Sequence, residues 1–153
     1  MRLICLHKNS FRYEQLVRYH PEVDDYKLYY AHSLYKEGLY DEALKACQNI
    51  ENPEHQQKLV LLQSSIRYEN NEIQHAKSLL RQADEGDPDI IVAEGCMLFK
   101  EGKYEEARVK FQEAMTITGN SCDLSYNIAL CYFKQKQLAP SLKYIAEIIE
   151  KGV

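Results

Sequence analysis

The sequence lacks the features that mark several large classes of protein. Lysine and arginine number 19 against 23 aspartates and glutamates, which gives a net charge of -4 and no basic excess. Nucleic acid and anionic membranes are bound through basic stripes or clusters. No apolar run approaches the roughly 20 residues that span a bilayer, and the apolar stretch near the start is too short for a secretory signal. We therefore expect neither nucleic acid binding nor membrane insertion.

Patterns that bind metals, cofactors or phosphate groups are also missing. The five cysteines never occur as CxxC and their number is odd, which argues against a zinc site and a disulfide framework. The histidines lack spacings such as HExxH, and there is neither a glycine-rich phosphate loop nor a nucleophile elbow. We predict a cytoplasmic, non-catalytic protein with reduced cysteines, no metal and no cofactor.

An internal repeat is the main positive feature of the sequence. Residues 31–43 (AHSLYKEGLYDEA) and residues 95–107 (GCMLFKEGKYEEA) share a small residue, Leu, an aromatic residue, Lys-Glu-Gly, Tyr and Ala at the same offsets. Residues 64–76 and 129–141 are more degenerate copies. The last positions of the four copies are 33, 31 and 34 residues apart. This period predicts helical hairpins of the tetratricopeptide type, whose unit has about 34 residues.

The predicted fold is an all-α, right-handed superhelical solenoid of such hairpins, forming a single domain over residues 1–153. A lone helix at about 10–20 precedes repeats at about 24–56, 57–87, 88–121 and 122–153. First helices are expected at about 22–37, 55–70, 89–101 and 122–135. Second helices are expected at about 40–51, 73–85, 104–118 and 138–151.

Local signals place the ends of these helices. The small residue that opens each copy, and the Ala or Ser that closes it, are expected where the two helices of a hairpin cross closely. Gly38 and Gly102 follow first helices, where a left-handed cap is needed. Asn52 and Asp87 precede prolines and are expected to cap the helices that those prolines begin. The final helix has no polar capping helix after it, so we expect the chain to be part of a longer solenoid.

The first helices carry a second apolar face, which predicts a binding groove. The residue four after each small position is aromatic in every copy, and the residue three before it is apolar. Such a groove suits an extended, proline-containing peptide. The alternative is that these aromatics only pack between adjacent helices. The predicted groove residues are Leu28, His32, Tyr35, Leu61, Tyr68, Val92, Phe99, Tyr126, Asn127 and Phe133.

A second functional class is a co-chaperone or adaptor that grips carboxylate-terminated tails with basic and amide side chains. Asn127 and Lys58 occupy places that such a clamp uses. The equivalents of Lys58 in the other copies are Asp25, Asp89 and Asp123, which would repel a carboxylate. The sequence therefore favours the aromatic groove over the clamp.

Three segments are more specific than the generic repeat. They are EVDDYKLYYA at residues 22–31, DLSYNIALCY at 123–132 and LKYIAEIIEKG at 142–152. Together they resemble the N-terminal part of the tetratricopeptide-repeat subunit of intraflagellar transport complex B, the fleer family. The resemblance covers about residues 11–153 and does not extend over residues 1–10.

The resemblance implies a non-catalytic subunit that works in the cytoplasm and the cilium. Family members are long solenoids that coil around an extended, proline-containing stretch of another complex B subunit. They are needed for cilium assembly and are linked to polyglutamylation of axonemal tubulin. Members begin with further repeats and continue far beyond the stretch that this chain resembles.

Overall fold

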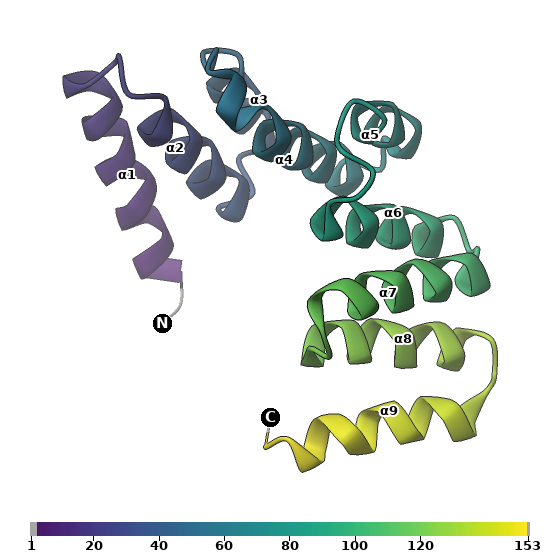
Figure 1. Cartoon of the computed structure of the whole chain (residues 1–153). Coiled ribbons are helices and arrows are strands. Elements are labelled where there is room, and N and C mark those ends of the chain that lie inside the picture. Colours follow the sequence, from purple (N-terminus) through teal and green to yellow (C-terminus); the bar gives the residue numbers. More distant parts are fainter. Residues whose placement is uncertain (1–2, 153) are drawn as a thin grey trace. The chain divides into compact units, whose positions relative to one another are not determined.

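The computed structural model describes the backbone of residues 3–152 and the side chains of residues 9–152. Within that range the chain forms helices and turns without a strand (Figure 1). It divides into two compact units, Met1–Ala83 and Asp84–Val153. The predicted all-helical class is confirmed, and each unit is described by itself below.

Unit 1 contains five α-helices and one short 3-10 helix. They are α1 (Leu3–Tyr19), α2 (Asp24–Lys36), α3 (Tyr40–Cys47), η1 (Pro53–His55), α4 (Gln56–Glu69) and α5 (Ile73–Leu80). α2 pairs with α3 and α4 pairs with α5, as hairpins, and α1 packs against α2. The lone helix therefore starts at Leu3 and not at about residue 10, since neither proline nor glycine interrupts this stretch.

Two second helices end earlier than the periodicity predicted. α3 and α5 end at Cys47 and Leu80, whereas helices to about 51 and 85 were expected. The chain beyond each end continues with tighter bonds, such as Ile50 N–H to Cys47 C=O at 3.3 Å and Ala83 N–H to Leu80 C=O at 3.0 Å. These bonds span three residues in place of four, so the last turn is wound as a 3-10 turn.

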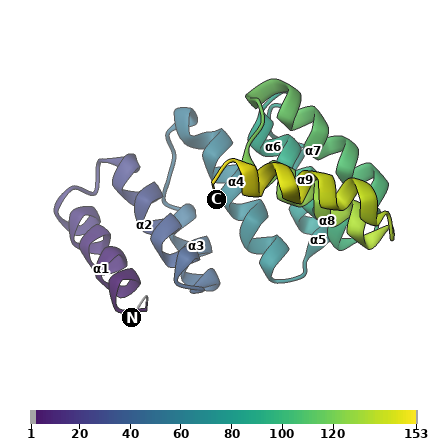
Figure 2. The same ribbon diagram turned by 90° about the horizontal axis from the view of Figure 1, so that it is seen from below.

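Unit 2 contains two longer hairpins. Its helices are α6 (Pro88–Lys100), α7 (Tyr104–Thr118), α8 (Cys122–Lys134) and α9 (Leu138–Glu150). α6 pairs with α7, α7 with α8, and α8 with α9. Figure 1 shows these helices stacked in that order, and Figure 2 shows the unit from below, with α9 in front. The bounds lie within about two residues of those predicted, because glycine, serine and proline mark them clearly.

Small residues allow the two helices of every hairpin to cross closely. The predicted small positions Ala31, Ser64, Gly95 and Ala129 are all buried, as are Ala43, Ala76, Ala107 and Ser141 on the second helices. Where one of these residues is serine, its hydroxyl is hydrogen bonded across the crossing. Ser64 Oγ donates to Ala76 C=O at 3.1 Å, and Ser141 Oγ donates to Ala129 C=O at 2.9 Å. The backbones therefore approach closely without an unsatisfied buried hydroxyl.

The α6–α7 crossing is the tightest of these places. A Cβ atom added to Gly95 would lie 2.7 Å from Cε1 of Phe111. Phe111 is only 2% exposed and belongs to the core of unit 2. Its ring fills the space that any side chain at position 95 would need.

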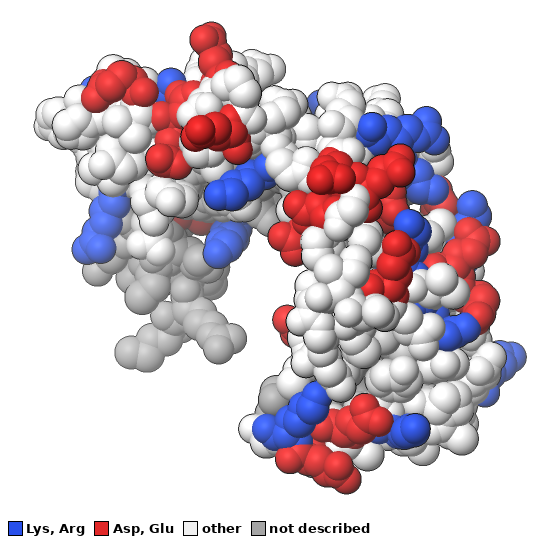
Figure 3. All heavy atoms as spheres, in the orientation of Figure 1, with Lys and Arg blue, Asp and Glu red and all other residues white. Residues whose placement is uncertain are grey.

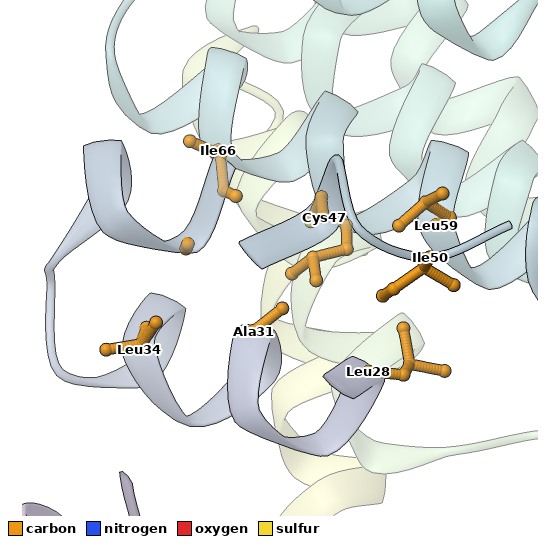
Figure 4. Close-up of a cluster of buried hydrophobic side chains, with 9 residues drawn as sticks. Leu28, Ala31, Leu34, Cys47, Ile50, Leu59 and Ile66 are labelled. Carbon is orange, nitrogen blue, oxygen red and sulfur yellow. The ribbon is translucent and has the colours of Figure 1, made fainter. Parts of the chain in front are cut away.

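Each unit has its own apolar core between the hairpin helices. The core of unit 1 includes Leu28, Ala31, Leu34, Cys47, Ile50, Leu59 and Ile66, contributed by α2, α3, α4 and the loop after α3 (Figure 4). The core of unit 2 includes Ile91, Phe111, Leu124, Ile128 and Cys131. Burial of such side chains contributes about 1.5–3 kcal/mol each and accounts for most of the stability of a helical hairpin.

The turns within the hairpins share one conformation. The residue with positive φ is Gly38 (79°), Asn71 (62°), Gly102 (81°) or Lys136 (61°). The next residue donates its N–H to the carbonyl five positions back, as in Leu39 to Leu34 at 3.0 Å and Gln137 to Tyr132 at 2.9 Å. This is the Schellman ending of a helix. The predicted caps are confirmed at Gly38 and Gly102.

Side-chain caps fix the beginning of several helices. Asn52 Oδ1 accepts from Glu54 N–H at 3.0 Å, and Asp87 Oδ1 accepts from Asp89 N–H at 2.8 Å, as predicted.

Asp24, the first residue of α2, forms hydrogen bonds with a distant loop. Its Oδ2 accepts the N–H groups of Glu51 and Asn52 at 3.1 and 2.9 Å. The carboxylate thus ties the start of α2 to the loop that follows α3, and its bond to Lys27 is the main cause that lowers the pKa of Asp24.

We expect Gly95→Ala to destabilise the protein. Overlap with the buried Phe111 ring should outweigh the ~1 kcal/mol that alanine gains in helix propensity, for a net loss of about 1–2 kcal/mol. Chemical denaturation measures the change. Gly86→Ala is the control, since its added Cβ meets only Asp84 Oδ1 at 3.5 Å. Equal stability of the two variants would contradict the close crossing.

Lys136→Gly should stabilise the chain by about 0.5–1 kcal/mol, because a side chain is strained at positive φ and glycine is not. The thermal melting midpoint of Lys136→Gly against the unaltered chain tests this. The reciprocal control is Gly38→Lys, which should lower the midpoint. A lower midpoint for Lys136→Gly would rule out the left-handed turn.

Candidate functional site

The predicted groove residues of unit 1 lie on α2 and α4 and differ in accessibility. Leu28 is 3% exposed and belongs to the core, so it offers little surface to a partner. His32, Tyr35, Leu61 and Tyr68 are partly buried. The face predicted from spacing alone therefore includes at least one residue that the fold uses for packing.

Aromatic pairs account for two of the predicted groove residues. The ring of Tyr35 lies 5.9 Å from that of Tyr40, and the ring of Phe99 lies 5.1 Å from that of Tyr104. Both pairs join a first helix to the first residue of the second helix, and Tyr35, Tyr40 and Phe99 also pack against the cores of their units. Burial is also the main cause that raises the pKa of Tyr35. Packing within the hairpin is thus enough to explain why positions 35 and 99 are aromatic, without a bound partner.

The last hairpin leaves its aromatics accessible. Tyr126 is 54% exposed and Phe133 is 56% exposed, and they lie seven residues apart on the same face of α8. The residue that opens α9 is Leu138, where α3 and α7 begin with Tyr40 and Tyr104 and α5 begins with Ile73. Without an aromatic partner at that place, Phe133 keeps a free ring face. Tyr126 and Phe133 therefore form the most accessible part of the predicted groove.

The remaining predicted residues are Val92 and Asn127 in unit 2 and His32 in unit 1. Val92 is partly buried against the core of unit 2, and Asn127 is partly buried on α8. His32 lines a pocket of about 260 Å³ between α1 and α2, together with Tyr13 and Tyr29. These tyrosines were not predicted as site residues, although Tyr29 lies three residues before His32 and thus on its face of the helix.

The charges do not match a carboxylate clamp. Asp25, Asp89 and Asp123 are exposed, and Asp25 Oδ1 lies 3.2 Å from His55 Nε2. Figure 3 shows carboxylates gathered where α6 begins, a stretch that contains Asp87 and Asp89. Negative charge at these places repels a carboxylate tail and complements the positive end of a helix dipole.

Two of the cysteines, Cys47 and Cys131, are buried. Burial raises the pKa of Cys47 and of Cys131 to about 11, which keeps both thiols protonated and unreactive near neutral pH. Among the described residues, no group of His, Cys, Asp or Glu side chains is arranged to hold a metal ion. No helix within that part of the chain has the length and apolar character to cross a membrane.

The outer face of α9 is apolar and exposed. Leu142 is 67% exposed and Ile149 is 66% exposed. The equivalent residues of α7, 34 positions earlier, are Arg108 and Met115, and both contact neighbouring residues of unit 2. Arg108 lies over the ring of Tyr132 on α8 at 5.1 Å, and Met115 packs against the core. α9 thus exposes the face through which α7 contacts α8.

Solved structures show the class of fold. A thermophilic TPR protein from Thermus thermophilus aligns with a TM-score of 0.80 at 15% identity, over 99% of this chain and 87% of that one. A tetratricopeptide repeat protein from Parabacteroides merdae aligns with a TM-score of 0.78 at 17% identity, over 97% and 60% of the chains. Cut9 in complex with Hcn1 aligns with a TM-score of 0.82 at 16% identity, over 96% and 30%. The chain thus has the tetratricopeptide-repeat fold, built from the hairpins that its sequence predicted.

Sequence comparison identifies the relatives within this class. No family model matches the chain. Intraflagellar transport protein 70A of Xenopus tropicalis is 53% identical over 141 residues, which is 92% of this chain and 22% of that protein. Intraflagellar transport protein 70A of Danio rerio is 50% identical over the same shares, and protein 70A1 of Mus musculus is 44% identical over 151 residues. The chain is thus homologous to part of the intraflagellar transport protein 70 proteins, which confirms the resemblance, and it spans under a quarter of their length.

Replacing a packed aromatic residue and replacing an exposed one should change the stability by different amounts. Phe99→Ala removes a ring that packs against Tyr104 and the core and should cost about 2–3 kcal/mol. Phe133→Ala removes an exposed ring and should change the free energy of unfolding by less than about 0.5 kcal/mol. Urea unfolding of both variants measures this. A large loss for Phe133→Ala would show that this ring serves packing.

Proposed function

We propose that the chain is a non-catalytic protein-interaction scaffold of intraflagellar transport, acting as part of a complex B subunit. The single observation that carries the proposal is the homology to intraflagellar transport protein 70 over 92% of the chain. The fold supports it, since tetratricopeptide hairpins stack into surfaces for other proteins. The unreactive buried thiols are consistent with a scaffold role. We further propose that the hairpins of both units belong to one tetratricopeptide domain.

The proposed partner is an extended, proline-containing segment of another complex B subunit. Tyr126 and Phe133 support this, because they present accessible aromatic surface seven residues apart on one helix. Aromatic surfaces bind extended proline-rich segments well, since such segments lose little conformational entropy on binding. Aromatic anchors also tend to dominate interface energies. Leu61, Tyr68, Val92 and Asn127 would extend the surface on their own units.

The cellular role is proposed from the same homology. We propose that the chain works in the cytoplasm and the cilium, supports cilium assembly and contributes to polyglutamylation of axonemal tubulin. The competing role is a co-chaperone that binds carboxylate-terminated tails. The exposed Asp25, Asp89 and Asp123 disfavour it, because a tail carboxylate would meet negative charge at three of the four equivalent positions.

Affinity capture from ciliated-cell lysate, followed by mass spectrometry, tests this function. The full chain should recover intraflagellar transport subunits, and the double variant Tyr126→Ala with Phe133→Ala should recover at least about tenfold less, equal to 1.4 kcal/mol. The control is Val109→Ala with Ile117→Ala, which removes two comparably exposed apolar side chains of α7. Recovery of chaperones without transport subunits would overturn the proposal in favour of the clamp.

A further inference from the structure

A pocket between α1 and α2 has a chemistry that the proposed aromatic surface does not share. Its volume is about 260 Å³, and it is lined by Asn9, Tyr13, Tyr29, His32, Ser33 and Lys36. Pockets for whole small-molecule ligands usually exceed about 300 Å³. This one suits a single side chain of a longer ligand.

The described lining consists of hydrogen-bond donors and aromatic rings. The side chains that line the pocket include an amide, two phenols, an imidazole and an ammonium group, and none of these six residues is a carboxylate. The hydroxyl of Ser33 is already used, since it donates to Tyr30 C=O at 2.7 Å. The rings of Tyr13 and Tyr29 lie 5.8 Å apart, tilted by 42°, and join the two helices. The pocket thus offers an apolar wall beside groups that donate to an acceptor.

The electrostatic environment of this pocket is positive. Burial lowers the pKa of His32, and the positive charges of Lys36 and Lys58 lower it further. Lys36 forms no ion pair with any carboxylate among residues 9–152. Figure 3 shows basic side chains on unit 1 near the C-terminal end of α2. An entering anion would therefore meet an ammonium group that is not already neutralised.

The other first helices do not repeat this chemistry. The equivalents of His32 are Ser65, Cys96 and Leu130. The equivalents of Lys36 are the acidic Glu69 on α4, Lys100 on α6 and Lys134 on α8, so the lysine recurs on two helices without the histidine. The combination of His32, Lys36 and the side chains from α1 is thus specific to the first hairpin and α1.

We propose that this pocket receives the carboxylate side chain of a glutamate or aspartate in an extended protein segment, with Lys36 and His32 as its polar contacts. This inference rests on the proposed binding of such a segment. The methylene groups of the acidic side chain lie against Tyr13 and Tyr29, and the carboxylate accepts from the ammonium group. A charge-assisted bond of this kind discriminates a carboxylate from the neutral amide of the same shape.

Two short probes test the pocket independently of the cellular partner. N-acetyl-Pro-Glu-Pro-amide and N-acetyl-Pro-Gln-Pro-amide differ only in the charged group, and each is titrated into the full chain while NMR signals of Tyr13, Tyr29 and His32 are followed. The glutamate probe should bind about tenfold more tightly, equal to 1.4 kcal/mol. Lys36→Gln should remove the difference. Lys134→Gln, at the equivalent exposed position of α8, should keep it.

The outcomes separate the pocket from the proposed function. Equal binding of the two probes, or equal loss in Lys36→Gln and Lys134→Gln, would overturn the pocket even if transport subunits are captured. A Lys36-dependent preference for glutamate would support the pocket even if no transport subunit is captured. Both variants alter exposed lysines, so circular dichroism should show unchanged helicity in each.

Discussion

The close crossing of two helices at small residues is the constraint on which the rest of the structure depends. The two helices of each hairpin cross at a pair of buried small residues, such as Ser64 and Ala76 or Gly95 and Ala107. A larger residue at one of these positions would separate the helices and open the core beside them. The crossing also sets how the first helices present their outer faces. The proposed binding surface therefore depends on small residues that are themselves buried.

Most of the fold could be predicted because its determinants are local. The repeat period, the glycines of the turns and the caps at Asn52 and Asp87 depend on residues close in sequence. The early ends of α3 and α5 could not be predicted in this way. Their last turns are wound as 3-10 turns, and Ile50 of the loop after α3 is 7% exposed. The early end of α3 depends on contacts distant in sequence, because Asp24 accepts the N–H groups of Glu51 and Asn52 in the loop after α3.

The candidate site was only partly predictable for the same reason. Periodicity shows which residues share a face of a helix. The accessibility of each residue depends on which side chain the second helix places next to it. Tyr35 and Phe99 pack against the rings of Tyr40 and Tyr104. The position equivalent to Tyr40 and Tyr104 is a leucine in the last hairpin, and Phe133 is 56% exposed. The pocket at His32 was missed because two of its six lining residues, Asn9 and Tyr13, come from α1, which lies outside the four repeat copies.

Site-specific photocrosslinking tests the central claim, that exposed aromatics on a first helix hold an extended segment of another transport subunit. A photoreactive phenylalanine analogue replaces Phe133 in one sample and Val109, 51% exposed on α7, in the other. After irradiation in ciliated-cell lysate, the analogue at position 133 should crosslink to one short proline-containing stretch of an intraflagellar transport subunit, and the analogue at 109 should not. The same products from both positions, or a chaperone tail at position 133, would contradict the account.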